Sequence, residues 1–252
     1  MGVVLEKIYK FTCDMCKEII NMIYPRRCPV CDNILSEQGV LCCQNCRKEL
    51  KYIHEPFCKK CGKPIEKDAI EYCYDCSKKE KNFVRGRAVF IYDDKMRESI
   101  VRFKYKGKRE YGQFYGQEIV NVLGKYISEL KVDAIIPVPI HKERYNNRGY
   151  NQADIIARYV GDKLGIQVIS DGLKRKVNTV AQKELDNKER NKNLYNAFES
   201  NIKQSVLDNI KKVLIIDDIY TTGATIDACA KALCNNKNIE VYFVTLTIGR
   251  GK

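Results

Sequence analysis

Two adjacent carboxylates and the hydroxyl-rich turn after them have the clearest chemical potential in this chain. Asp217 and Asp218 follow a run of four apolar residues, Val213–Ile216, and precede Thr221-Thr222-Gly223-Ala224-Thr225. Carboxylates accept hydrogen bonds from sugar hydroxyls and help to hold Mg²⁺. The turn offers hydroxyls and backbone N–H groups at the start of a predicted helix, where the helix dipole favours anions. The segment therefore predicts a receptor for a phosphorylated sugar.

An ordinary strand–loop–helix with two solvated acids is the alternative interpretation of this segment. The apolar run before the acids and the Thr-x-Gly-x-Thr pattern after them favour the binding site. The chain contains neither Gly-x4-Gly-Lys-[Ser/Thr] nor Gly-x-Gly-x-x-Gly. Its sequence is therefore not typical of the nucleotide hydrolases that use a phosphate-binding loop, nor of dinucleotide-binding enzymes.

A second predicted strand is followed by a basic segment. The strand, residues 132–138, leads into Pro137-Val138-Pro139, and three cations come after it: Lys142, Arg144 and Arg148. The arginine fork matches phosphate oxygens, and lysine acts as a mobile point charge. A departing pyrophosphate needs such neutralisation. A solvated basic loop is the alternative. Phe103–Lys108 is another basic and aromatic run, which could stack on bases or could simply be an exposed helix end.

Eight of the thirteen cysteines form two sets with identical spacing. The sets are Cys28-x2-Cys31-x11-Cys43-x2-Cys46 and Cys58-x2-Cys61-x11-Cys73-x2-Cys76. A two-residue spacing lets one tight knuckle direct two sulfurs at one ion, and two knuckles complete a tetrahedral shell. The spacing predicts two structural Zn²⁺ sites of the ribbon type, in which the metal supplies most of the folding free energy.

The spacing leaves the ligand assignment open in several ways. Pairing within each set is the most economical, but a crossed arrangement, first knuckle with third and second with fourth, has the same spacing. Cys42 could replace Cys43, although only Cys43 keeps the two-residue interval. An iron–sulfur or redox role is the alternative to zinc. Cys229 and Cys234 are interpreted as residues without chemistry.

The pattern of apolar residues divides the chain into three predicted parts. Residues 1–25 form an amphipathic helix that Pro25 ends, with Cys13 and Cys16 as packing residues. Residues 26–85 hold the two zinc ribbons. Residues 86–252 alternate short strands with helices, which predicts right-handed crossovers and a mostly parallel sheet with flanking helices, an α/β fold.

The formal net charge of +13 predicts an anionic partner, either nucleic acid or a polyphosphate ligand. Zinc-bound thiolates would cancel the small cationic excess of residues 1–85, so the basicity lies in the C-terminal part. A lysine-rich solvated surface is the alternative. No secretory signal and no apolar run of about 20 residues are present. With reduced, paired cysteines, a cytoplasmic protein without a transmembrane segment is expected.

These motifs resemble, in order, those of the ComF/ComFC competence proteins, which are amidophosphoribosyltransferase-like. Val213–Thr225 is similar at all thirteen positions to the binding signature of the type I phosphoribosyltransferases. The other matching motifs are Pro25–Cys31, Phe103-Lys104-Tyr105-x-Gly107, Pro137–Pro139 with Arg144, Arg148–Gln152, Leu173-x-Arg175, Thr179-x-x-Gln182 and Arg190-x-x-Asn193. Tyr150 stands where the family usually has Phe.

The resemblance implies a type I phosphoribosyltransferase fold, Mg²⁺-dependent binding of 5-phosphoribosyl-1-pyrophosphate and a part in DNA uptake during natural competence. It assigns the 5′-phosphate to Thr221–Thr225 and the ribose hydroxyls to Asp217 and Asp218. It assigns the pyrophosphate to Val138, Pro139, Lys142, Arg144 and Arg148, and it gives Gln152 and Arg175 as further substrate-binding residues. Catalysis is expected to rest on Asp217, Asp218, Arg144 and Arg148.

Two functions of different kinds follow from this resemblance. The first is a glycosyltransferase that moves the phosphoribosyl group to an acceptor with loss of pyrophosphate. The second is a non-catalytic module that senses the ligand and binds single-stranded DNA or a competence helicase. Thr221 stands where several purine-salvage relatives carry an acid that acts on the base, which argues against a simple purine acceptor.

Overall fold

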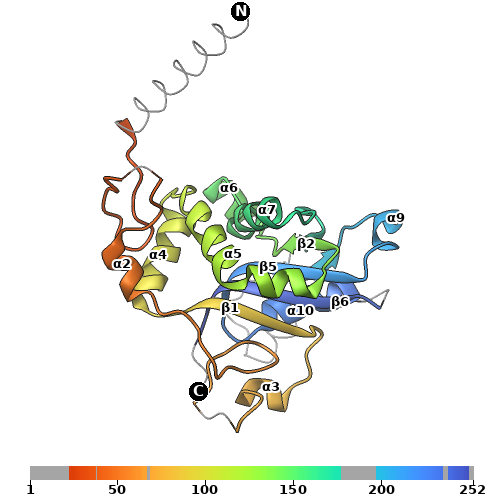
Figure 1. Ribbon diagram of the computed structural model, residues 1–252. Helices are drawn as coiled ribbons and strands as arrows, with labels where there is room; N and C mark the ends of the chain where they lie inside the picture. Colours follow the sequence, from red (N-terminus) through yellow and green to blue (C-terminus); the bar gives the residue numbers. More distant parts are fainter. Residues whose placement is uncertain (1–22, 38, 67–68, 177–196, 235–237, 250–252) are drawn as a thin grey trace, which may run out of the picture.

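The computed structural model describes residues 23–37, 39–66, 69–176, 197–234 and 238–249. Its centre is a parallel four-stranded sheet with the strand order β1–β6–β5–β2 (Figure 1). The strands are β1 (Arg85–Ile91), β2 (Ala134–Pro137), β5 (Lys212–Tyr220) and β6 (Glu240–Ile248). Strands of a parallel sheet are buried on both faces, which explains their nearly continuous apolar sequences. The predicted α/β fold is confirmed.

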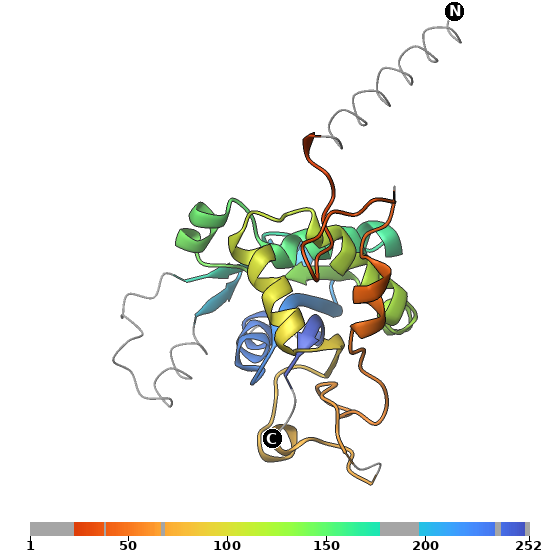
Figure 2. The same ribbon diagram turned by 90° about the vertical axis from the view of Figure 1, so that its left-hand side faces the viewer.

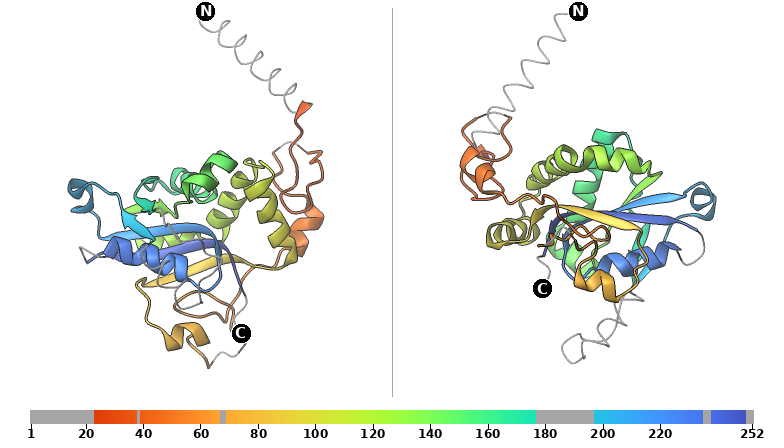
Figure 3. Two further views of the ribbon diagram at one scale, coloured as in Figure 1. Left: turned by 180° about the vertical axis from the view of Figure 1, so that it is seen from behind. Right: turned by 60° about the horizontal axis from the view of Figure 1, so that its bottom comes forward.

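Helices cover both faces of this sheet (Figures 1 and 3). Helices α5 (Tyr111–Leu130) and α7 (Gln152–Leu164) pack against each other on one face, and α10 (Ala224–Cys234) packs on the opposite face. Glycine in α5 permits the close approach of α7. A Cβ atom added at Gly116 would lie 2.6 Å from the ring of Tyr159 on α7. Helix α4 (Asp94–Tyr105) precedes α5.

The remaining elements are short. An antiparallel hairpin of β3 (Leu173–Arg175) and β4 (Phe198–Ser200) packs on α10. The short helices are α2 (Gln44–Glu49), α3 (Tyr74–Lys78), α6 (Lys142–Arg148) and α9 (Gln204–Leu207). The structure differs from the sequence analysis at two places. The basic segment after β2 was expected to be a loop, but it contains α6. The pair of strands β3 and β4 was not predicted.

Alternation along β5 divides the core into two clusters. Leu214 and Ile216 belong to the cluster on the α5 and α7 side, whereas Val213 and Ile215 belong to the cluster on the α10 side. Successive side chains of a strand point to opposite faces, so the next two residues, both acids, inherit the same alternation.

The two cysteine-rich ribbons, residues 23–50 and 54–78, pack on different sides of the sheet (Figure 2). The first ribbon joins the cluster of α4 and α5 through Cys28, Val30 and Cys46. The second ribbon joins the α10 cluster through Cys58 and Cys61. Between the ribbons, the chain forms a bridge antiparallel to β1, at Tyr52 and Phe90, and so covers this edge of the sheet.

Two predictions fall on residues outside these ranges. The amphipathic helix of residues 1–25, with Cys13 and Cys16, lies almost wholly outside the described residues, as do the motifs Thr179-x-x-Gln182 and Arg190-x-x-Asn193. Among the helices that the structure describes, none combines the length and apolar character needed to cross a bilayer.

Candidate functional site

Strand β5 carries both acids within its hydrogen-bonded part. The apolar run predicted a strand that stops at Ile216, but β5 continues to Tyr220, and Asp217 is in register with Thr245 of β6. The prediction of the strand end was therefore too short. Pairing with the neighbouring central strand extends the ladder past the acids, so the acids lie on a rigid element rather than on a loop.

The two carboxylates are held in different environments. Asp218 is buried, and its Oδ2 atom lies 2.7 Å from Nζ of Lys104, at the end of α4. Asp217 is half-buried, and its Oδ1 atom accepts a 2.8 Å hydrogen bond from the backbone N–H of Asp218. Burial, with the neighbouring charge of Asp218, raises the pKa of Asp217 to about 8. The carboxylate of Asp217 is thus turned toward residue 218, close enough for the charges of Asp218 and Lys104 to act on it, so one ligand can meet both acids at this end of β5.

The hydroxyl-rich turn follows β5 directly and begins α10. Thr221 and Thr222 are exposed, so their hydroxyls are accessible to a ligand. Gly223 adopts the left-handed conformation with a φ of 77° and is buried against Tyr220. The Oγ1 atom of Thr222 accepts a 3.4 Å hydrogen bond from the N–H of Ala224. The first N–H groups of a helix lack intrahelical partners, and here they adjoin accessible hydroxyls, an arrangement suited to phosphate.

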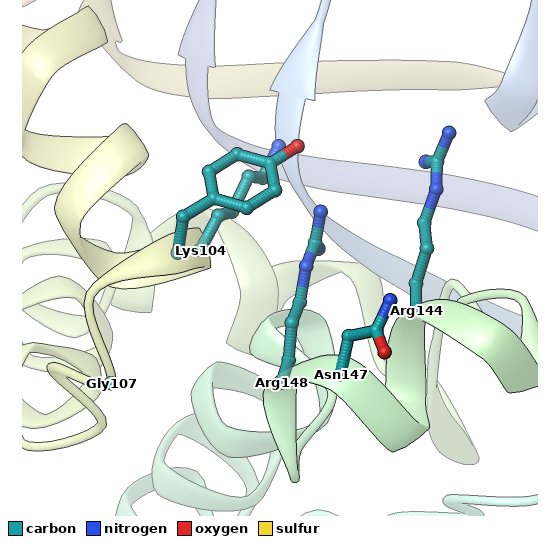
Figure 4. A pocket seen from close by; sticks show the side chains of 6 residues that line it. Lys104, Gly107, Arg144, Asn147 and Arg148 are labelled. Atoms are coloured by element: carbon teal, nitrogen blue, oxygen red, sulfur yellow. The ribbon is translucent and has the colours of Figure 1, made fainter.

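A basic pocket of about 240 Å³ opens between the end of α4 and helix α6 (Figure 4). Its lining residues are Lys104, Tyr105, Gly107, Arg144, Asn147 and Arg148. Arg144 and Arg148 are one helical turn apart on α6 and extend in the same direction, with Arg148 nearer the Lys104 side. The guanidinium of Arg148 lies 4.5 Å from the centre of the Tyr105 ring, a cation–π distance. Three cations thus share one cavity.

Arg175 adds a fourth cation on the α10 side. It lies on β3, with its guanidinium 5.6 Å from the ring centre of Phe198. Burial and the positive charge of Arg144 lower the pKa of Arg175. Within the described parts of the chain, no carboxylate forms an ion pair with Arg144, Arg148 or Arg175. Positively charged side chains that lie near one another, with no acid to neutralise them, favour the binding of an anionic ligand.

The other predicted substrate-binding residues occupy varied positions. Val138 is buried, and its N–H donates a 2.9 Å hydrogen bond to the carbonyl of Ile216, while Pro139 is half-buried. Lys142 is exposed at the start of α6. Gln152 is buried, and its Oε1 atom accepts a 3.1 Å hydrogen bond from Arg148, so it orients a cation of the pocket.

Sequence reasoning did not assign a site role to Lys104, Tyr105 or Asn147. Lys104 and Tyr105 lie in the run 103–108, which was interpreted as a base-stacking segment or an exposed helix end and as a family motif, without a role in the sugar-phosphate site. Asn147 had no signal beyond its place between the two arginines. The contact of Lys104 with Asp218 joins residues far apart in the chain, and no local pattern could have shown it.

The eight spaced cysteines form two separate clusters. In each cluster the four sulfur atoms lie within 4.8 Å of one another: Cys28, Cys31, Cys43 and Cys46, then Cys58, Cys61, Cys73 and Cys76. Bonds of about 2.3 Å to one Zn²⁺ place tetrahedral sulfurs about 3.8 Å apart. The Sγ atoms of Cys61 and Cys73 are 3.6 Å apart, and those of Cys31 and Cys43 are 3.9 Å apart. Both clusters therefore fit a zinc ion, and the pairing is local.

Cys42 is a fifth thiol beside the first cluster. Its Sγ atom lies 3.8 Å from that of Cys28. A hydrogen bond from the Cys42 thiol lowers the pKa of Cys28 to about 3, and the resulting thiolate is the form that binds metal. The cluster of four includes Cys43, in agreement with the two-residue spacing, while Cys42 packs against it.

Comparisons with known proteins agree with these features. A family model described as the double zinc ribbon domain matches residues 19–77. Competence protein F of Haemophilus influenzae is 36% identical over 110 residues, which are 43% of this chain and 48% of that protein. Competence protein ComFC of Streptococcus pneumoniae is 31% identical over 155 residues, 62% of this chain and 64% of that protein. ComFC of Bacillus subtilis is 28% identical over 149 residues, 59% of this chain and 58% of that protein.

The chain thus spans between about half and just under two thirds of the length of these relatives. The chain is therefore similar to proteins named competence protein F and ComFC, and its residues 19–77 match the double zinc ribbon domain.

Proposed function

We propose that this protein binds 5-phosphoribosyl-1-pyrophosphate with Mg²⁺ and transfers the phosphoribosyl group to an acceptor. One observation carries the proposal. Asp218 on β5 forms an ion pair with Lys104, which lines the pocket between α4 and α6, and three residues after Asp218 the chain enters the turn that begins α10. A sugar at this end of β5 would therefore meet an acid, a cationic pocket for its diphosphate and a phosphate-binding turn.

Each subsite has a distinct chemical role in this proposal. Thr221–Thr225 would bind the 5′-phosphate through hydroxyls and N–H groups. Asp217 and Asp218 would accept hydrogen bonds from the ribose hydroxyls. Arg144 and Arg148 would neutralise the charge that grows on the departing pyrophosphate, which is the main electrostatic demand of this reaction.

The donor chemistry of the site also suits Mg²⁺. Carboxylate and phosphate oxygens are the ligands that this ion prefers. Asp218 would supply a carboxylate, and Asp217 would supply a second one when Mg²⁺ displaces the proton that its raised pKa retains. When bound, Mg²⁺ supplies charge neutralisation on the diphosphate oxygens. The protein's own part is to hold the sugar at the acids of β5, with its diphosphate toward the arginines of α6.

A calorimetric titration of 5-phosphoribosyl-1-pyrophosphate, with and without Mg²⁺, tests the proposal. We expect saturable binding that Mg²⁺ strengthens, and a loss of at least about tenfold in affinity for Asp218→Asn, because the variant lacks a charged acceptor. Asp171→Asn is the control, since Asp171 is an exposed acid outside the site. Wild-type affinity in Asp218→Asn would refute the assignment of the acid.

Transfer is tested separately by a pyrophosphate-release assay over nucleobases, nucleosides and single-stranded DNA. Release that requires one of these acceptors would support catalysis. Binding of the sugar diphosphate without release for any acceptor would instead favour a ligand-sensing module.

We further propose a role in DNA uptake, and this rests on the relatives. Three of them are named competence proteins, and others, from Escherichia coli and Salmonella, are named DNA utilization proteins, at 30% identity over 118 residues for the Salmonella proteins. Deletion of the corresponding gene, with complementation by wild type or Asp218→Asn, tests it. We expect the deletion to abolish transformation and only the wild type to restore it.

Binding of single-stranded DNA by the second ribbon is a second candidate function. Tyr72 and Tyr74 are exposed there, and Nζ of Lys78 lies 5.9 Å from the centre of the Tyr74 ring. Exposed aromatic rings beside lysines are suited to stacking on bases. We expect Tyr74→Ala to weaken the binding of a labelled single-stranded oligonucleotide, measured by fluorescence anisotropy, and unchanged binding would remove this candidate. A competence helicase is the alternative partner for such a non-catalytic module.

A further inference from the structure

Lys104 joins the acids of β5 to the basic pocket. Its ammonium lies 2.7 Å from Oδ2 of Asp218, and both side chains are largely withdrawn from solvent, with exposed fractions of 21% and 8%. Among the described residues, Lys104 is the cation that forms an ion pair with the acids of β5, through Asp218. Breaking such a partly buried pair would leave a desolvated charge, so an opposite charge must replace the lost partner.

The position of Lys104 is fixed by a rigid helix. Asp93 caps the start of α4 by accepting a 3.0 Å hydrogen bond from the N–H of Met96. At the other end, Phe103 is fully buried, and the hydroxyl of Tyr150 donates a hydrogen bond to its carbonyl. Only the flexible four-carbon stem of Lys104 is therefore free to change direction.

Lys104 also lines the pocket that contains Arg144 and Arg148 (Figure 4). A diphosphate in this pocket would attract Lys104, and a divalent cation near Asp218 would repel it. The two halves of the proposed ligand thus favour the same displacement of Lys104, away from the acid and toward the phosphates.

We propose that Lys104 is an exchangeable counter-ion, which neutralises Asp218 in the free protein and moves to the diphosphate when the magnesium complex of the sugar binds. This inference rests on the proposed function for the identity of the ligand. The exchange has a consequence for specificity. A divalent cation alone must compete with the ammonium for Asp218 and binds poorly, whereas the complex provides phosphates that accept the displaced cation.

Binding of Mn²⁺ alone tests the first half of the proposal. Mn²⁺ is a hard cation with the same preference for carboxylates as Mg²⁺, and the electron paramagnetic resonance signal of the free ion reports its binding. Without any sugar diphosphate, we expect zinc-loaded Lys104→Met to bind Mn²⁺ at least about tenfold more tightly than wild type, because one positive charge has been removed beside the acids. The gain should vanish in the double variant Lys104→Met, Asp218→Asn.

Lys125→Met is the matched control, since Lys125 is exposed on α5 and should leave Mn²⁺ binding unchanged. Lys104→Gln serves as a second variant that retains a polar end, and zinc content and thermal unfolding verify that each variant is folded. Equal Mn²⁺ affinities for wild type and the Lys104 variants would overturn the proposal. Failure of both variants to fold would also overturn it, because Lys104 would then be a structural residue.

The sugar diphosphate tests the second half. In the presence of Mg²⁺, we expect Lys104→Met to bind 5-phosphoribosyl-1-pyrophosphate about tenfold more weakly than wild type, since the phosphates lose a cation. Unchanged affinity would exclude movement of Lys104 to the diphosphate. If the wild type binds no sugar diphosphate at all, the proposed function fails. The comparison with Mn²⁺ alone still decides whether the ammonium of Lys104 competes with a divalent cation for Asp218.

Discussion

Gly223 shows how the fold of a turn can require one particular residue. Its φ of 77° is a conformation that residues with a Cβ atom adopt at a cost, and an added Cβ would overlap the hydroxyl of Tyr220. The ring of Tyr220 is stacked on Phe243, at 4.9 Å between centres and an interplanar angle of 2°, so it has little freedom to withdraw. The turn therefore has no room for a side chain at position 223.

We predict that Gly223→Ala destabilises the protein by about 3 kcal/mol, from backbone strain and overpacking together. It should also weaken the binding of the sugar diphosphate. Urea unfolding and calorimetry measure the two effects. Gly165→Ala is the control, because Gly165 has a φ of 68° and no atom within 4 Å of an added Cβ. Equal losses of stability in the two variants would show that Tyr220 imposes no steric limit.

Asp217 makes stability depend on pH. Its pKa is raised to about 8 by burial and by the charge of Asp218, so the folded protein retains a proton that the unfolded chain has lost. The stability linked to this proton is complete below the ordinary pKa of an aspartate and is lost as the pH rises through the folded value.

Asp217→Asn, which needs no proton, should therefore gain stability relative to wild type between about pH 6 and about pH 8. Urea unfolding at several pH values measures the difference. The exposed acid Asp171 provides the control Asp171→Asn, for which the difference from wild type should stay constant. A constant difference for Asp217→Asn as well would contradict the raised pKa.

The strands and long helices were predictable because their apolar periodicity is local. The alternation of strands and helices predicted for residues 86–252 is confirmed, and the thirteen-residue signature correctly joined a strand, a turn and a helix. The length of β5 was not predictable from the same pattern. Its continuation through two acids depends on pairing with β6 and on the environment around Asp218, and neither is local in sequence.

Helix α6 was missed for a different reason. It has seven residues, and none of its side chains is buried, so it has no apolar face for a periodicity search to find. Its ends are set by capping instead. The Nδ1 atom of His141 accepts a hydrogen bond from the N–H of Glu143, and Gly149 follows in the left-handed conformation. The candidate cations were therefore identified by type, while their common direction required the structure.

Docking of the first ribbon depends on a buried acid of α5. Glu118 is 1% exposed and accepts hydrogen bonds of 3.0 Å from Arg47 and 2.6 Å from the hydroxyl of Tyr52. We predict that Glu118→Ala destabilises the protein by about 2 kcal/mol, because it leaves both donors without their acceptor. Glu129→Ala, at an exposed position of the same helix, should have little effect in the same urea unfolding experiment. Equal effects would mean that the acid does not hold the ribbon.

The two ribbons brace opposite sides of the proposed site. The first packs with α4, which carries Lys104. The second packs with Phe83 and Phe243, whose rings contact that of Tyr220, immediately before the turn Thr221–Thr225. The knuckle of the second ribbon also touches the sheet, since the N–H of Gly86 on β1 donates a 2.8 Å hydrogen bond to the carbonyl of Lys60. A small ribbon has almost no core of its own, so its metal must maintain this contact.

Loss of the second zinc should therefore loosen the turn Thr221–Thr225. We predict two Zn²⁺ per wild-type chain and one for Cys73→Ser, measured by elemental analysis, because the local clusters share no ligand. Without its ion the second ribbon should unfold and uncover Phe83, so hydrogen exchange at residues 220–226 should rise and affinity for the sugar diphosphate should fall. Cys234→Ser is the control, since Cys234 belongs to neither cluster and should retain both ions. Unchanged exchange at the turn in Cys73→Ser would show that the ribbon is attached to the transferase-like fold without supporting its site.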